Sequence, residues 1–217
     1  SRRTDIPAFF SDWFFNRLKA GYCLVPNPFN PKQISKIELT PENIGGIVFW
    51  TRNPAPMLGR LPILDEMRLP YYFLFTLNNY PKALEPNLPP LESSINSFHK
   101  LFNITGIERL VWRYDPLILS GDLDENFHIK NFTKLCERLA GCTRQAITSV
   151  ISPYRKTLRR MKKAGIAFKK ENTDFELYIR LLMKIKAIAE ANGMDLTVCS
   201  HSEDFSRAGI KRSKCIN

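Results

Sequence analysis

Short apolar runs alternate along the chain with segments whose apolar residues recur every three or four positions. The runs are rich in β-branched and aromatic residues, which is the pattern of buried strands. Five runs of this kind lie at residues 47–50, 71–75, 109–116, 146–151 and 194–198. Residues 22–25 form a shorter candidate strand, and residues 1–7 resemble the exit of a further strand whose body would precede them.

The segments between these runs have helical spacing and recognisable ends. Helices are predicted at residues 10–20, 91–102, 124–139, 154–163 and 173–193. Asp124 is expected to cap the third of them, and Thr173 with Glu176 forms a capping box for the last. In the fourth helix, Tyr154 and the apolar residues at helical spacing after it are expected to point inward.

Strands that alternate with helices predict an α/β fold with a parallel sheet. Nearly every predicted strand ends in polar residues, which is typical of a (β/α) barrel, where ligands bind at the carboxyl ends of the strands. We therefore expect residues 1–217 to form one domain, a (β/α) barrel or an incomplete TIM-type barrel of about six parallel strands. A doubly wound open sheet is the alternative, although no glycine-rich loop follows a strand and a dinucleotide site is not supported.

The segment Arg109–Pro116 holds the clearest candidate for chemistry. Arg113 and Asp115 lie two positions apart at its end, so their side chains share one face of the strand. An earlier segment, Trp50-Thr51-Arg52-Asn53-Pro54, resembles it when Trp50 is aligned with Trp112. We interpret the two as equivalent strand ends on one ligand-facing rim. An internal salt bridge from Arg113 or Arg52 to Asp115 is an equally good explanation.

Other polar residues extend this predicted rim. Guanidinium groups suit carboxylates and phosphates, so the arginines are expected to hold an anionic small molecule while carboxyl and amide groups bond a sugar or an amino group. The amino-terminal members are equally well explained as a solvated chain end. The predicted ligand-binding residues are Arg2, Arg3, Asp5, Trp50, Arg52, Asn53, Thr76, Arg113, Asp115, Ser149 and Tyr154.

Composition narrows the function classes. The hydrophobic content of 44% and charged content of 24% are those of a globular protein, and no apolar run approaches the ~20 residues of a membrane span. Five cysteines at irregular spacing do not form a secreted disulfide framework, so a reducing cytoplasm is expected. We expect no membrane partner.

The net charge of +11 is concentrated in one segment. Eight basic residues and no acidic residue lie between Pro153 and Lys170. This segment offers phosphate contacts for nucleic acid, with Arg155, Arg159, Arg160 and Lys163 as the candidates, although no recognition motif accompanies them. A solvated helix face explains the same pattern.

Histidine and cysteine provide few metal-site candidates. The three histidines lack zinc-site spacing, and His128 lies on an apolar helical stripe, where a hydrogen-bonded core histidine is expected. Cys199 ends a predicted strand and Cys215 lies near the end of the chain. Two thiols rarely hold a metal by themselves, so further ligands would be needed.

Several strings resemble an uncharacterised prokaryotic family, the domain of unknown function DUF1848. They are Ser-Arg-Arg-Thr-Asp-Ile-Pro-Ala-Phe at 1–9, Asn-Pro-Phe-Asn-Pro-Lys-Gln at 27–33, Val-Phe-Trp-Thr-Arg-Asn-Pro-Ala-Pro-Met at 48–57, Trp-Arg-Tyr-Asp-Pro at 112–116 and Lys-Cys-Ile-Asn at 214–217. The resemblance implies a barrel-type α/β fold with no established reaction. It also implies a cysteine cluster near the carboxyl terminus, similar to the set that holds the iron–sulfur cluster of radical S-adenosylmethionine enzymes.

This chain has no Cys-x-x-x-Cys-x-x-Cys sequence, so the resemblance places such a cluster in a tail beyond Asn217 or leaves the chain without one. The leading hypothesis is a radical S-adenosylmethionine-like enzyme that binds an anionic small molecule at the rim, with Cys199 and Cys215 near an iron–sulfur cluster. The alternatives are a nucleic-acid-associated repair or modification protein that uses residues 154–163, and a non-catalytic ligand-binding barrel.

Overall fold

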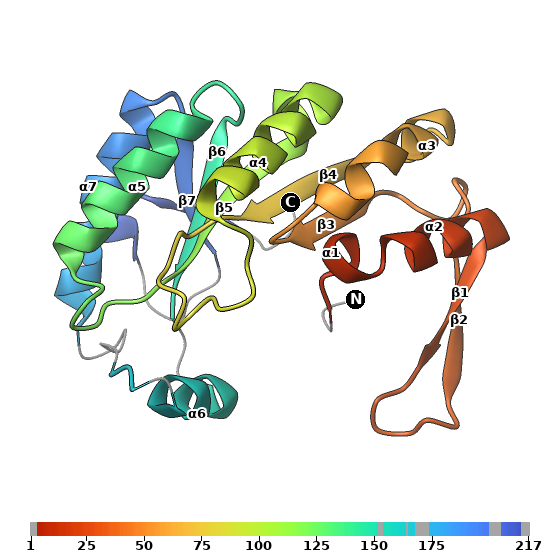
Figure 1. The fold of residues 1–217 in the computed structure, drawn as a ribbon, viewed down its shortest axis with the longest axis horizontal. Helices are drawn as coiled ribbons and strands as arrows, with labels where there is room; N and C mark the ends of the chain where they lie inside the picture. Colours follow the sequence, from red (N-terminus) through yellow and green to blue (C-terminus); the bar gives the residue numbers. More distant parts are fainter. Residues whose placement is uncertain (1–3, 152–153, 164, 168–173, 200–204, 214–217) are drawn as a thin grey trace.

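A parallel sheet of six strands forms the centre of the protein (Figure 1). The computed structural model describes residues 4–151, 154–163, 165–167, 174–199 and 205–213. In sheet order, the strands are β3 (Ile47–Thr51), β4 (Tyr71–Thr76), β5 (Leu110–Leu117), β6 (Gln145–Val150), β7 (Asp195–Cys199) and β8 (Lys211–Ser213). The α/β class and the parallel sheet are thereby confirmed.

The strand order follows the chain from β3 to β8 without reversal. A doubly wound sheet reverses its order at a switch point, so that alternative is wrong for the described strands. The sheet is nevertheless open, because β3 and β8 form its two edges within the described residues and do not pair with each other. A closed TIM barrel is therefore not formed by this part of the chain.

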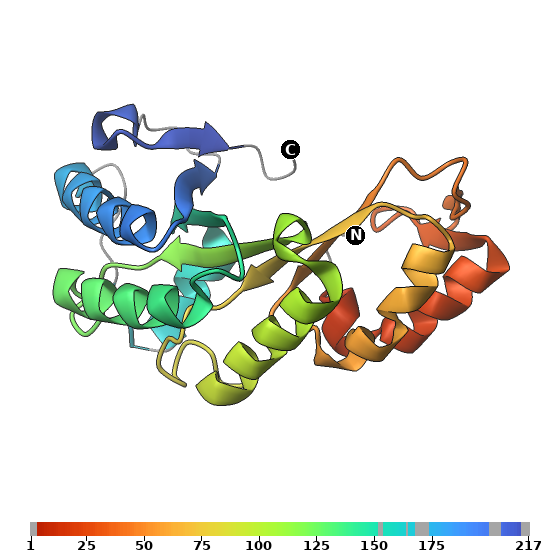
Figure 2. The same cartoon turned by 90° about the horizontal axis from the view of Figure 1, so that it is seen from above.

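Helices cover the outer side of the curved sheet, where Figure 2 shows α4 and α5 beside the strands. The helices are α1 (Ile6–Phe9), α2 (Ser11–Ala20), α3 (Leu61–Glu66), α4 (Leu91–Thr105), α5 (Glu125–Leu139), α6 (Arg155–Lys163) and α7 (Phe175–Ala191), with short 3-10 turns η1 (Ala55–Arg60), η2 (Ile107–Arg109) and η3 (Phe205–Ala208). None of the described helices has the length and apolar character needed to cross a bilayer.

The main core lies between the strands and these outer helices. Phe49 of β3 stacks on Phe73 of β4 with ring centroids 4.8 Å apart, and Trp112 of β5 stacks on Phe132 of α5 at 4.7 Å. The predicted cap of α5 is confirmed, because the Asp124 carboxylate accepts a hydrogen bond from the backbone N–H of Phe127 at 2.7 Å. The apolar stripe of α5 is therefore fixed against the sheet from its first turn.

The opposite, inner face of the sheet carries a smaller apolar cluster. Its buried members are Leu74, Val111, Ile147 and Cys199, and Trp50 packs against them. Because side chains alternate along a strand, Arg113 and Asp115 follow Val111 onto the same face. The inner face thus changes from apolar to charged toward the carboxyl ends of the strands.

The predicted equivalence of Trp50 and Trp112 is wrong. In the sheet Trp50 pairs with Leu74, and Leu74 pairs with Val111, so Trp112 is one position out of register with Trp50. A shift of one residue moves a side chain to the other face. Trp50 consequently lies on the inner face, whereas Trp112 is fully buried against the outer helices.

Three further expectations differ from the structure. Residues 6–9 form helix α1 rather than the exit of a strand, and the sixth strand is β8 near the carboxyl end. The candidate strand at residues 22–25 is confirmed as β1 (Tyr22–Pro26), but it pairs with β2 (Ile34–Glu38) in a separate antiparallel hairpin. Tyr154, predicted to point inward, is 73% exposed.

Candidate functional site

The loop that follows β4 is tied to the end of β5 by Asn78. This side chain accepts a hydrogen bond from the backbone N–H of Asp115 at 2.8 Å and donates to the Asp115 carbonyl at 2.9 Å. It also donates to Oε1 of Glu85 at 3.0 Å. Asn78 is almost completely buried, so these bonds are shielded from water and hold the loop over the carboxyl ends of the strands.

Arg52, directly after β3, is held at two points. Its backbone N–H donates to Oδ2 of Asp5 at 2.8 Å, and its Nη1 donates to Oε1 of Glu85. The other oxygen of Asp5 accepts from the backbone N–H of Ala8 at 3.0 Å, which caps α1. Asp5, predicted to bind ligand, therefore has both carboxylate oxygens bonded to the backbone and acts as a positioning residue for Arg52.

Arg113 and Asp115 form an internal salt bridge, which was one of the two explanations that the sequence allowed for these residues. Nη2 of Arg113 lies 2.7 Å from Oδ2 of Asp115, and the side chains are only 13% and 17% exposed. Ser149 donates to the second Asp115 oxygen. The Arg113 guanidinium also lies over the Trp50 ring at 5.2 Å. Four predicted residues are thus brought together, in contact with one another.

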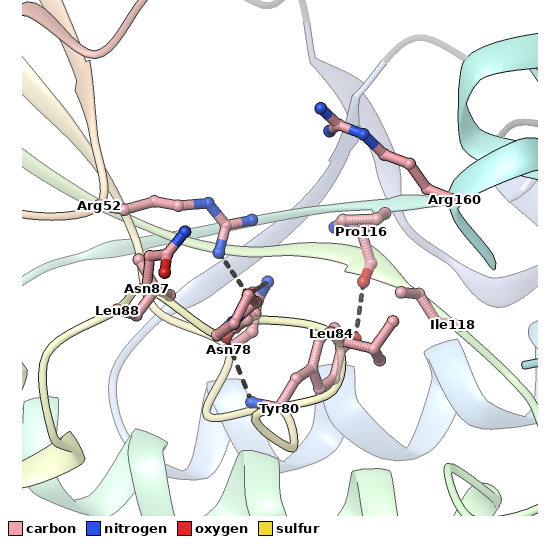
Figure 3. A pocket seen from close by; sticks show the side chains of 11 residues that line it. Arg52, Asn78, Tyr80, Leu84, Asn87, Leu88, Pro116, Ile118 and Arg160 are labelled. Carbon is pink, nitrogen blue, oxygen red and sulfur yellow. Dashed lines mark hydrogen bonds and ion pairs between the residues drawn. The ribbon is translucent and has the colours of Figure 1, made fainter. Parts of the chain in front are cut away.

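A pocket of about 320 Å³ opens beside this cluster (Figure 3). In Figure 3 the guanidinium groups of Arg52 and Arg160 reach into the same space from opposite sides, one from the end of β3 and one from α6. Glu85 pairs with Arg52, whereas Arg160 has no ion-pair partner among the described residues. The lining residues are Arg52, Asn78, Tyr80, Leu84, Glu85, Pro86, Asn87, Leu88, Pro116, Ile118 and Arg160.

A buried hydrogen-bond network supports the floor of the pocket. Tyr80 donates to the Pro116 carbonyl at 2.6 Å. Behind it, Nε2 of His128 lies 3.0 Å from the Ile118 carbonyl and must carry the proton, so Nδ1 accepts from the Tyr114 hydroxyl at 2.9 Å. Asn131 donates to the same hydroxyl at 3.1 Å. The prediction that His128 is a hydrogen-bonded core histidine is confirmed.

Burial is the main cause of the pKa shifts of the titratable side chains in this network. Desolvation raises the pKa of Tyr80 well above its usual value, and the nearby Tyr114 and Glu85 raise it further. Desolvation likewise raises the pKa of Tyr114 and lowers the pKa of His128. All three side chains are therefore neutral near pH 7, and the network is a rigid support rather than a source of charge.

The other described residues predicted to lie on the rim are not among those that line the pocket. Asn53 turns its side chain back to accept from the backbone N–H of Ala55 at 3.2 Å, and Thr76 pairs with Arg113 across the sheet. Tyr154 does not line the pocket. Arg2 and Arg3 lie outside the described residues.

The basic helix α6 faces solvent and also contributes to the pocket. All four candidate nucleic-acid residues are exposed, and one of them, Arg160, lines the pocket; the four are Arg155, Arg159, Arg160 and Lys163. The helix is therefore a wall of the pocket as well as a basic surface.

Of the two predicted metal ligands, Cys199 lies within the described residues. Cys199 is 5% exposed and packs in the small apolar cluster with Leu74, Val111 and Ile147. The described part of the chain contains no group of three or more His, Cys, Asp and Glu side chains able to hold a metal ion. Cys215 lies outside the described residues.

Sequence reasoning missed Glu85, Asn87 and the structural role of Asn78. Asn78 carried a signal, because polar residues follow the end of the aromatic strand at 71–75. Glu85 and Asn87 lie in an irregular loop between Pro81 and Pro90, where no periodicity indicates which side chains turn toward the sheet.

The comparison with curated proteins and the comparison with solved structures each gave no match. A family model described as "Domain of unknown function (DUF1848)" matches residues 1–217, which is the entire chain. The family suggested by the sequence strings is thereby confirmed, and the chain belongs to the DUF1848 family.

Proposed function

We propose that the protein binds an anionic small molecule, through a phosphate or carboxylate group, in the pocket between Arg52 and Arg160. The observation that carries this proposal is that two arginines, Arg52 and Arg160, line one pocket together with a single carboxylate, Glu85, which pairs with Arg52. Two cations that line one pocket are unfavourable to each other unless anions neutralise them. The pocket therefore has an excess positive charge that an anionic ligand would neutralise.

The local structure favours a fork-shaped contact with such an anion. Glu85 engages only Nη1 of Arg52, so the other guanidinium nitrogens have no partner among the described residues. Arginine binds phosphate and carboxylate through two parallel hydrogen bonds when its fork is held in place. Asp5 holds the Arg52 backbone and Glu85 holds its guanidinium group before any ligand arrives. A volume of about 320 Å³ suits a small metabolite rather than a polymer.

Isothermal titration calorimetry with pyrophosphate tests the proposal. Arg160→Gln should weaken binding at least about tenfold, because a charge-assisted hydrogen bond contributes about 1.5–3 kcal/mol. Arg144→Gln is the matched control, because it removes the same charge directly before β6, where Arg144 pairs with Glu108 at the surface. It should leave binding unchanged. Absence of binding by the unsubstituted chain, or equal losses in the two variants, would contradict a site in this pocket.

We also propose, on the family resemblance, that the site serves a radical S-adenosylmethionine-like enzyme with an iron–sulfur cluster. The sequential, one-way strand order, similar to part of a (β/α) barrel, supports this extension. Within the described residues Cys199 packs in the small apolar cluster and no group of three or more metal-ligating side chains is found, so the ligands of such a cluster would have to come from other residues. No reaction step is therefore assigned. Anaerobic reconstitution with iron and sulfide, followed by assay for 5′-deoxyadenosine, tests the extension; no product and no cluster absorbance would refute it.

Nucleic acid is a second candidate ligand because α6 exposes a tyrosine beside its cations. Tyr154 is 73% exposed directly before Arg155, and Arg159 lies exposed one turn later. Exposed aromatic rings stack on bases of single strands while arginines contact phosphates. Fluorescence anisotropy with a single-stranded oligonucleotide should then respond to Tyr154→Ala and to Arg155→Gln/Arg159→Gln. An unchanged isotherm in both variants would exclude this use of α6.

A further inference from the structure

The two carboxylate oxygens of Glu85 are used unequally. Oε1 accepts from Nη1 of Arg52 and from Nδ2 of Asn78, the latter at 3.0 Å. Oε2 has one long contact with the backbone N–H of Tyr80, at 3.4 Å. The side chain is 10% exposed and lines the pocket. A carboxylate has about four acceptor positions, so the acceptor capacity of Glu85 that remains is mostly on Oε2.

Glu85 has more hydrogen-bond acceptor capacity than it needs to neutralise Arg52. One oxygen already neutralises the guanidinium, and Asn78 fixes that oxygen from the buried side. A carboxylate kept in a mostly buried position with an incompletely bonded oxygen is unfavourable unless a donor reaches that oxygen. Among the described residues, the Tyr80 N–H is the one donor that does so. Glu85 therefore brings an incompletely bonded acceptor to a pocket that Arg52 and Arg160 also line.

We propose that the ligand is a small phosphorylated amine, whose ammonium group donates to Oε2 of Glu85 while its phosphate contacts Arg52 and Arg160. This inference rests on the proposed anion site and specifies its ligand class. Charge balance supports it: the two arginines and Glu85 leave one net positive charge. A phosphate monoester carries close to two negative charges at pH 7, so an ammonium group on the same ligand brings the filled pocket near neutrality.

An amine also uses Glu85 better than a hydroxyl group does. A hydrogen bond between an ammonium and a carboxylate is charge-assisted and roughly twice as strong as one between neutral groups. Because the pocket is partly shielded from water, that interaction is weakened less by solvent than a surface ion pair. Glu85 would thus select the amine, and the arginines would bind the phosphate.

A pair of nearly isosteric probes tests the inference by calorimetry. O-phosphoethanolamine and propyl phosphate differ in an ammonium group that replaces a methyl group. The unsubstituted protein should bind O-phosphoethanolamine about tenfold to a hundredfold more tightly. Glu85→Gln removes the carboxylate but keeps an oxygen for Arg52, and should abolish this preference, so that the variant binds the two probes with equal affinity. Glu92→Gln, at an exposed ion pair with Arg138, is the matched control and should retain the preference.

Each outcome separates the inference from the proposed function. Equal affinity of the unsubstituted protein for the two probes overturns the amine assignment and leaves the anion site standing. Binding of neither probe overturns both. A preference that survives in Glu85→Gln overturns the role of Glu85. The comparison of two probes on the unsubstituted protein does not depend on how well a variant folds, so the inference remains testable in every case.

Discussion

Replacing Asn78 with alanine should destabilise the protein by about 3 kcal/mol. Asn78 makes two hydrogen bonds with the backbone of Asp115 and one with Glu85. A net contribution of about 1 kcal/mol for each bond gives the total. Because Asn78 is buried and alanine leaves the Asp115 backbone groups without these partners, the loss should lie within about 2–4 kcal/mol.

Urea unfolding monitored by circular dichroism measures this effect. With a slope of about 2 kcal/mol per molar urea, the midpoint should fall by roughly 1.5 M. Asn96→Ala changes the same residue type on the exposed face of α4 and should alter the unfolding free energy by no more than about 0.5 kcal/mol. Asn78→Asp keeps an acceptor for the Asp115 N–H but brings a second carboxylate to Glu85, so it should be at least as destabilising as alanine.

The reasoning would be refuted by an Asn78→Ala midpoint within experimental error of the unsubstituted protein. The loop after β4 would then be held by contacts other than Asn78. A fall in midpoint that the Asn96 control reproduces would also refute it, because the loss would reflect a general effect of the substitution.

Three further predictions test the core and the salt-bridge cluster. Burial lowers the pKa of His128 below 6.5, so on acidification the imidazole takes up a proton in the unfolded chain before it does in the folded protein. The free energy of unfolding should therefore fall as the pH drops below about 6.5. Urea titrations at pH 7.5 and 5.5 should show a smaller difference in unfolding free energy for His128→Gln than for the unsubstituted protein. Trp112→Phe removes the hydrogen bond to the Leu77 carbonyl and should cost about 2 kcal/mol, whereas Trp13→Phe, 44% exposed, should cost less than about 0.5. Ser149→Ala should lower the unfolding free energy by about 1 kcal/mol; no change would contradict its bond to Asp115.

The sequence predicted the elements better than their arrangement around the sheet. The strands at 47–50, 71–75 and 146–151 and the capped helix after Asp124 are local features, fixed by residue type and spacing. The strand β8 was missed because Lys211–Ser213 is short and has no apolar run. Its pairing with β7 is a tertiary contact that local pattern does not encode.

Within the candidate site, the sequence predicted which polar residues lie at the end of the sheet, but it did not predict which side chains they contact. The spacing of Arg113 and Asp115 predicted a shared face, and the structure brings them within 2.7 Å. The sequence similarity between the segments around Trp50 and Trp112 led to a wrong prediction, because similarity in sequence does not fix the register between strands. Glu85 could not be assigned from an irregular loop, although it pairs with Arg52 from 33 positions away.

By itself, the sequence determined that polar groups follow the strands and that one helix concentrates the positive charge, because alternation, capping and charge spacing act over a few residues. The tertiary structure decided which of these groups meet. It turned Trp112 toward the helices and Trp50 to the inner face, and it brought Arg160, rather than Tyr154, into the pocket with Arg52. Such meetings depend on register and loop path, which are set by packing across the whole domain.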